Sequence, residues 1–159
     1  MRYLKSISQR EIGLLLLLFY FIQLFIPWHD LALVQWQNQR MVKIITGCTL
    51  LFIVMSPWLL TFSRVVLEIG GSQWQRLTKW HRWIGTISPI VYFFHSIEPG
   101  YGLLLLLTSI FFINHFLASL NNEAPYWIRI FPVWILIHVS LSILIMVLSC
   151  YHIYLIAAY

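Results

Sequence analysis

The sequence predicts an all-α protein, a polytopic transmembrane bundle of about five helices that form a single domain over residues 1–159. Hydrophobic residues make up 60% of the chain and charged residues only 9%, whereas a soluble domain usually has about 25% charged residues. Apolar stretches of roughly 20 residues, the length that crosses a bilayer, recur along the chain. The expected surrounding is therefore a lipid bilayer, and no polar segment is long enough to form a soluble catalytic domain.

Short connections separate the predicted helices. The first has a basic start and no small-residue cleavage site, so we expect a retained helix rather than a cleaved signal peptide. Pro57 falls inside the second, a glycine turn at Gly70-Gly71 precedes the third, and Pro99 separates the third from the fourth. Cys48 and Cys150 fall in apolar segments without a CxxC spacing and are expected to be buried hydrophobes. The predicted helices cover residues 11–28, 41–62, 77–97, 101–120 and 131–159.

The distribution of basic residues predicts the orientation of the bundle. The formal net charge is +5, but the basic residues lie near helix ends, which indicates membrane topology rather than nucleic-acid binding. Only Arg40 and Lys43 fall on one side of the predicted bundle. The other eight fall on the opposite side, and an excess of Lys and Arg marks the cytoplasmic side, so we expect a cytoplasmic N-terminus. These eight residues are Arg2, Lys5, Arg10, Arg64, Arg76, Lys79, Arg82 and Arg129.

Two pairs of histidines are the most informative feature of the sequence. His81 and His95 lie 14 residues apart on the predicted third helix, and His138 and His152 lie 14 residues apart on the fifth. Fourteen residues nearly complete four helical turns, so both members of a pair lie on the same face, about 21 Å apart along the axis. The two helices are expected to run in the same direction. His81 and His138 then share one depth in the membrane, and His95 and His152 share another.

We interpret this pattern as the ligand set of two b-type haems, one in each leaflet, each held by one histidine from either helix. The alternative is that the histidines hydrogen-bond between helices or line a proton path. A single metal ion explains the pattern less well. Histidines about 21 Å apart cannot bind one ion, and no carboxylate or cysteine accompanies either level.

Residues next to His81 are candidates for contacts with the cofactor. Gly85 lies one turn after His81 on the same face and would leave room for a flat ring. Arg82 and Lys79, together with Arg76, cluster at the expected cytoplasmic end, where they can pair with haem propionates.

The remaining histidines have less specific interpretations. His115, on the fourth predicted helix, could be a third-helix ligand, a quinone contact, or a polar group satisfied by helix packing, and the last is the simplest. His29 follows the first helix and is expected to be exposed at the membrane interface, with a role at an outer acceptor site as the alternative.

The histidine pairs and their surroundings resemble the ferric reductase-like transmembrane domain family, which includes NADPH oxidases, metalloreductases and the bacterial haem subunit MsrQ. The resemblance rests on Ser63-Arg64, on RLTKWHRWIG at residues 76–85 and on the histidine pairs, and it covers roughly residues 57–156. It implies a helical bundle that moves electrons across the membrane. It also implies that His81 and His138 resemble the inner haem ligands, and His95 and His152 the outer ones.

The chain departs from this family pattern in three respects. Relatives typically have a sixth helix, many carry a cytoplasmic flavin and nicotinamide domain, and the histidine spacing on their fifth helix is often thirteen. No GxGxxG motif follows a strand in this sequence. We therefore expect no flavin or nicotinamide site in the chain.

The expected function is that of a membrane di-haem cytochrome b, an oxidoreductase subunit that transfers electrons across the bacterial cytoplasmic membrane. A separate donor protein or a membrane quinol would supply the electrons, with the chain as part of a larger reductase complex. The alternative from another class is a non-redox membrane subunit or a small proton or metal transporter. It would use His81, His115 and His138.

Overall fold

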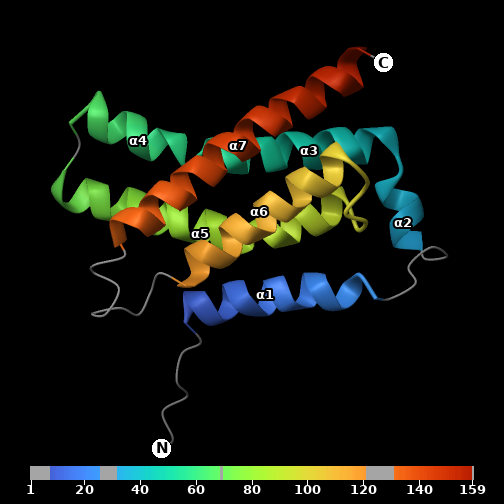
Figure 1. Ribbon diagram of the computed structural model, residues 1–159, viewed down its shortest axis with the longest axis horizontal. Helices are drawn as coiled ribbons and strands as arrows, with labels where there is room; N and C mark the ends of the chain where they lie inside the picture. Colours follow the sequence, from blue (N-terminus) through green and yellow to red (C-terminus); the bar gives the residue numbers. More distant parts are fainter. Residues whose placement is uncertain (1–7, 26–31, 69, 121–130, 159) are drawn as a thin grey trace, which may run out of the picture.

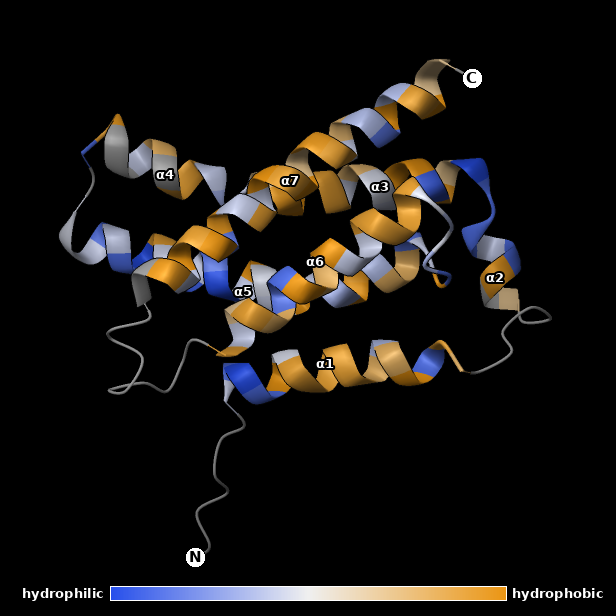
Figure 2. Ribbon diagram, viewed as in Figure 1, coloured by the Kyte–Doolittle hydropathy of each residue, from blue (hydrophilic) through white to orange (hydrophobic). Residues whose placement is uncertain are grey.

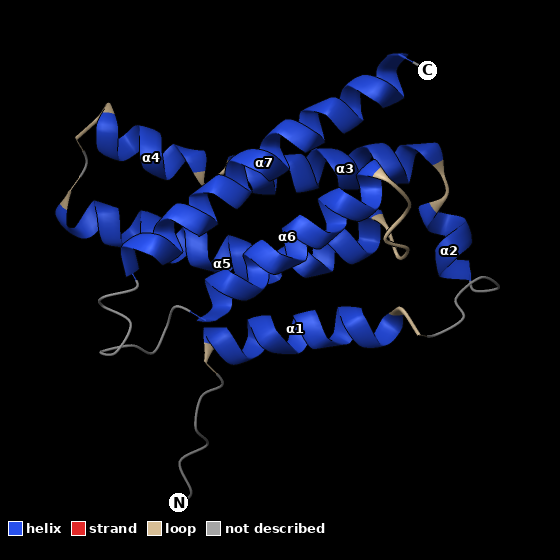
Figure 3. Ribbon diagram, viewed as in Figure 1, coloured by secondary structure: helices blue, strands red, loops and turns tan. Residues whose placement is uncertain are grey.

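The computed structural model describes residues 8–25, 32–68, 70–120 and 131–158, and every regular element in these ranges is an α-helix (Figures 1 and 3). Each predicted helix is represented with somewhat different ends, but the second is divided in two and one further short helix is present. The helices are α1 (Gln9–Gln23), α2 (Ala32–Gln37), α3 (Arg40–Met55), α4 (Trp58–Val65), α5 (Gly71–His95), α6 (Leu103–Leu120) and α7 (Phe131–Ala158).

The long helices alternate in direction. α1, α5 and α7 run one way through the bundle, and α3 and α6 run the opposite way (Figure 1). α6 packs on α7 and α1, and α5 packs on α3 and α1. By contrast, the backbones of α5 and α7 are not in extensive contact. The two helices that carry the histidine pairs therefore run in the same direction, as predicted, and are held apart by their neighbours.

Local sequence signals explain where several helices begin and end. Ser8 caps α1 in a capping box, in which its hydroxyl accepts from the Glu11 amide and the Glu11 carboxylate accepts from the Ser8 amide. The predicted second helix divides into α3 and α4 at Ser56-Pro57, because proline has no amide hydrogen to donate inside a helix. The predicted glycine turn is confirmed, since Gly70 precedes the first residue of α5.

The start of α5 lies six residues before the predicted one. Hydropathy locates the apolar part of a helix, whereas the first turns of α5 are polar and exposed to solvent. The apolar stretch at residues 31–36, considered as a continuation of the first helix, corresponds instead to the separate short helix α2 from Ala32.

A tight turn joins α5 to α6 and confirms the predicted break at Pro99. Gly100 has φ +73° and Gly102 has φ +54°, a region that disfavours residues with a Cβ atom. A Cβ atom at residue 100 would also lie only 2.6 Å from Cβ of Leu104. The turn therefore requires glycine at position 100 for both its backbone conformation and its packing.

An aromatic cluster fills the centre of the bundle. Tyr20 on α1 stacks on Phe112 of α6 with ring centroids 4.0 Å apart, and Tyr92 on α5 stacks on Phe111 at 5.2 Å. Because the Thr108 hydroxyl donates to the carbonyl of Pro99, the Tyr92 hydroxyl is the donor in its short hydrogen bond to Thr108. Each such aromatic pair adds about 0.5–1.5 kcal/mol beyond the burial of its area. The cluster joins α1, α5 and α6 into one unit.

Two buried glutamines fasten the end of the bundle where α5 stops. Gln23 of α1 donates to the carbonyl of Ile97 at 3.0 Å, and Gln37 of α2 donates to the carbonyl of Phe93 at 2.6 Å. The last turn of a helix leaves carbonyl groups without helical partners. The glutamines supply donors there, so α1 and α2 both hold the end of α5 in place.

The bundle has the surface of a membrane protein. In the described part of the chain, three helical segments are long and apolar enough to cross a membrane: Arg40–Leu60, Leu103–Leu120 and Val133–Ala158. Their outer faces expose many large apolar side chains, and hydrophilic residues gather near the two ends of the bundle (Figure 2). Cys48 and Cys150 are also exposed on this surface rather than buried as predicted. The total of five spans stays a prediction.

The turn between α5 and α6 yields a first prediction. Gly100→Ala should lower the thermal stability of the detergent-solubilised protein, because it adds both an unfavourable backbone conformation, at about 1–2 kcal/mol, and a clash with Leu104. Gly102→Ala is the matched control, because it changes the conformation but meets no atom within 4 Å. Equal melting temperatures for the two variants would contradict this account of the turn.

Candidate functional site

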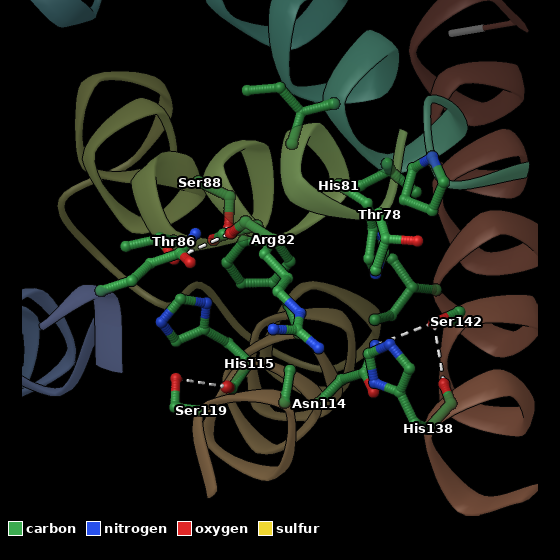
Figure 4. A pocket seen from close by; sticks show the side chains of 18 of the residues that line it. Thr78, His81, Arg82, Thr86, Ser88, Asn114, His115, Ser119, His138 and Ser142 are labelled. Carbon is green, nitrogen blue, oxygen red and sulfur yellow. Dashed lines mark hydrogen bonds between the residues drawn. The ribbon is translucent and has the colours of Figure 1, made fainter. Parts of the chain in front are cut away.

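The described helices enclose a cavity of about 330 Å³ at the end of the bundle where α1, α5 and α7 begin. This volume is within the range of small-molecule sites, about 300–1,000 Å³. Side chains from α1, α3, α5, α6 and α7 line it, and its lining residues include two histidines of the predicted pairs, His81 and His138. Figure 4 shows these two side chains next to one another on the α7 side of the cavity, with His115 on the other side. No Asp or Glu is among the described lining residues.

His81 and His138 are brought together across the gap between α5 and α7. Their ring centroids lie 6.2 Å apart and their planes are inclined by 72°. The Nδ1 atom of each ring is buried, and neither has a hydrogen-bond partner among the described residues. Because the two helix backbones are not in extensive contact, the paired imidazoles are what spans the gap at this level.

A framework of side chains that the sequence analysis missed surrounds His138. Trp134 stacks on the His138 ring with centroids 5.3 Å apart and planes only 7° apart, and its indole N–H donates to the carbonyl of Leu117. Ser142 donates to the His138 carbonyl, and Asn114 donates to the Ser142 hydroxyl at 3.0 Å. The available signal was helical spacing, since Trp134 and Ser142 lie one turn before and after His138.

The residues near His81 that were predicted to contact a cofactor do not all line the cavity. Gly85 lines the cavity, and a Cβ atom there would meet nothing within 4 Å. Arg82 also lines the cavity, and Figure 4 shows its guanidinium group reaching into the space between His115 and His138. Lys79 is exposed and is not among the lining residues. Arg76 is likewise exposed and absent from the lining, so of the three predicted basic contacts only Arg82 is at the site.

The second histidine pair lies at the other end of α5 and α7. His95 and His152 are close enough to interact electrostatically, but no ring contact like that of His81 and His138 joins them in the described structure. His95 instead contacts α3, where the Thr46 hydroxyl lies 3.2 Å from the Nδ1 atom of His95. A Cβ atom at Gly47 would lie 3.0 Å from Cε1 of His95. Thr46 and Gly47 also escaped the sequence analysis, because they form no motif of their own.

His115 is buried, and its Nε2 atom lies 3.4 Å from the carbonyl of Gly13 on α1. Ser119, one turn later on α6, donates to the carbonyl of His115. This geometry favours the interpretation of His115 as a polar group satisfied by helix packing, although its side chain also lines the cavity. His29, the other secondary candidate, lies outside the described residues.

The described residues of the site form no metal cluster of three or more ligands. Within the described ranges, no group of three or more His, Cys, Asp or Glu side chains is arranged to hold a metal ion. The structure instead presents histidines two at a time.

Two glycines in the histidine-bearing region give a second prediction. Gly47→Ala should lower the melting temperature of the cofactor-free protein, because its methyl group would press on the His95 ring. Gly85→Ala should not, because its methyl group enters open space and alanine is favoured in a helix by roughly 0.5–1 kcal/mol. Thermal unfolding in detergent compares them, and a larger loss of stability for Gly85→Ala would contradict the described environments.

Comparison of the chain with models of protein families, with curated proteins and with solved structures found no match. The resemblance to the ferric reductase-like family therefore rests on the residues quoted above. The roles of the histidine pairs have to be argued from the geometry of this chain.

Proposed function

We propose that this protein is a membrane di-haem b-type cytochrome, a ferric reductase-like subunit that transfers electrons across the membrane. The observation that carries the proposal is the His81–His138 pair, with ring centroids 6.2 Å apart beside a cavity, on two helices whose backbones are not in extensive contact. His95 and His152, one membrane leaflet away on the same two helices, supply the second pair.

His81 and His138 would hold the iron of an inner haem. Their ring centroids are 6.2 Å apart, a separation that leaves room for a metal–nitrogen bond of about 2.0 Å to each ring. An edge-to-face contact between two neutral imidazoles has a similar separation. Such a contact does not account for a cavity of about 330 Å³ beside the rings or for two buried Nδ1 atoms without described partners.

Other residues of the cavity suit a flat, apolar macrocycle with carboxylate groups. Gly85 leaves open space beside His81, and the apolar side chains of Ile53, Val54 and Ile145 contribute to the lining. Arg82 extends into the cavity, and no described lining residue carries a negative charge to compete for it. Arg82 would therefore pair with a propionate, while Trp134 holds the His138 ring in its orientation.

When bound, haem supplies one-electron transfer between ferric and ferrous iron. The protein fixes the two ligand levels along α5 and α7 and keeps their surroundings apolar. The aromatic cluster around Tyr20 and Phe112 packs α1, α5 and α6 together, which excludes water from the centre of the bundle. This arrangement supports electron transfer between the two faces of the membrane without a path for ions.

The proposal includes an orientation, a location and a source of electrons. Arg10 and Arg82 line the same cavity at one end of the bundle, whereas Arg40 begins α3 at the other end. This distribution supports a cytoplasmic N-terminus in a multi-pass bacterial inner-membrane protein, with α1 and α5 as further spans. Electrons would come from a separate protein or a membrane quinol, within a larger reductase complex.

The third prediction tests the ligands. The purified protein should contain two b-type haems per chain, with absorption bands that sharpen on reduction by dithionite. His81→Ala and His138→Ala should each remove the same single haem, and the double variant should lose no more than either one. Quantitative haem extraction and reduced-minus-oxidised spectra measure this outcome.

His115→Gln is the matched histidine control, because glutamine can still donate to the Gly13 carbonyl, and it should retain both haems. A protein that stays colourless after reconstitution with haem would contradict the proposal. Proton or metal transport by such colourless protein in liposomes would establish the non-redox alternative.

A further inference from the structure

Hydrophobicity does not determine the rotation of α7 about its own axis. α7 contains the most apolar of the three candidate spanning segments, and its apolar residues are distributed evenly around the helix. Lipid tails and the apolar interior of a bundle are similar solvents, so an evenly apolar helix gains little from turning one face inward rather than another. Another interaction must therefore select the residues of α7 that face the bundle.

Two hydrogen bonds to α6 lie on either side of His138. One turn before it, the Trp134 indole N–H donates to the carbonyl of Leu117 at 2.9 Å. One turn after it, the Ser142 hydroxyl accepts from the side chain of Asn114 at 3.0 Å. Residues four apart in a helix share one face. These three residues of α7 therefore form a line along the helix, and both ends of the line are bonded to α6.

The hydroxyl group of Ser142 fixes the direction of the second bond. It donates its only hydrogen to the carbonyl of His138 at 2.8 Å, so toward Asn114 its oxygen can only accept. The amide of Asn114 is therefore oriented with its NH2 group toward α7. Asn114 is only 9% exposed, and a buried donor without a partner is unfavourable. A different rotation of α7 would leave this donor unpaired.

We propose that Asn114 and Trp134 are positioning residues that set the rotation of α7, so that His138 faces His81 and can share one iron atom with it. For the role of the two histidines this inference rests on the proposed function, and it adds the contacts that aim one of them. α7 packs on α6 and is not in extensive contact with α5. α6 is therefore the helix that can hold His138 at 6.2 Å from His81, measured between ring centroids.

The first experiment follows the rotation of α7 without haem. The full-length chain carries His81→Cys and His138→Cys, and serine replaces Cys48 and Cys150. A short thiol-reactive cross-linker such as dibromobimane should join positions 81 and 138, and mass spectrometry measures the yield. Asn114→Leu keeps the size of the side chain but removes the hydrogen-bond donor. It should lower the yield several-fold, because α7 is then free to turn.

The second experiment follows haem at the inner site, defined as the binding that is lost in His81→Ala when the haem-free protein is titrated in detergent. Trp134→Phe keeps a stacking ring but removes the N–H donor. This variant and Asn114→Leu should each weaken haem binding at the inner site by roughly tenfold. The haem that still binds should have an altered low-spin EPR spectrum, because this spectrum depends on the angle between the two imidazole planes. A general loss of stability would lower the amount of haem without changing the spectrum.

Substitutions on α7 supply the controls. Ser142→Thr retains a hydroxyl group that can accept from Asn114, so it should behave as the wild type in both experiments. Ser142→Ala should reproduce the effect of Asn114→Leu, and the double variant should lose no more than either one, because both changes remove the same bond. Ser140→Ala is the matched control, because Ser140 is exposed on the same helix, and it should change neither the yield nor the spectrum.

The outcomes separate this inference from the proposed function. An unchanged cross-link yield in Asn114→Leu, or an equal loss in Asn114→Leu and Ser140→Ala, would overturn the inference. An unaltered EPR spectrum in both Asn114→Leu and Trp134→Phe would overturn it as well. A wild-type protein that binds no haem, but whose cross-link yield depends on Asn114, would overturn the proposed function and support the assigned rotation of α7.

Discussion

A buried imidazole needs a partner, because an unsatisfied polar group in an apolar environment is energetically unfavourable. This constraint connects most of the packing in the bundle. His115 reaches the backbone of α1 at Gly13, and His95 reaches the hydroxyl of Thr46 on α3. His81 and His138 are the exception: their rings are in contact between α5 and α7, but their Nδ1 atoms have no hydrogen-bond partner among the described residues. Each buried histidine thus lies at a junction between helices, and the glycines at positions 13 and 47 are where those junctions are closest.

The packing of α6 keeps α5 and α7 apart. This helix packs on α7 along one side, and through Phe111 and Phe112 it stacks on α5 and α1. The large rings keep α5 at the distance of an aromatic pair from α6, and Trp134 ties α7 back to α6 through Leu117. The cavity is therefore bordered by bulky contacts that hold α5 and α7 apart.

Much of this arrangement could be predicted from the sequence. The helices, the breaks at Gly70 and Pro99, and the parallel course of the two histidine-bearing helices follow from hydropathy and turn residues, which act locally. The pairing of His81 with His138 follows from periodicity. The sequence does not reveal that Arg82 lines the cavity whereas Lys79 does not. The two residues are three positions apart on one helix, and the walls that decide which side chain enters the cavity come from distant segments of the chain.

The contributions of Thr46, Gly47 and Trp134 were beyond the reach of sequence reasoning for a related reason. Each acts on a histidine through a contact of specific geometry, and a threonine or glycine in an apolar helix carries no sign of its partner. The short helix α2 was missed because its apolar residues continue those of the first helix in composition. Only the buried hydrogen bond from Gln37 to Phe93 shows that it folds back onto α5.

Both histidine pairs share one helix, α7, which follows α5 in the chain. His81 and His95 are synthesised and inserted first, yet each lacks its opposing histidine until α7 has entered the bundle. His95 already contacts Thr46 of α3 before that point, whereas His81 meets its neighbour His138 only when α7 arrives. Insertion of α7 therefore brings both histidine pairs together in one step, even though they lie at opposite ends of the same helices.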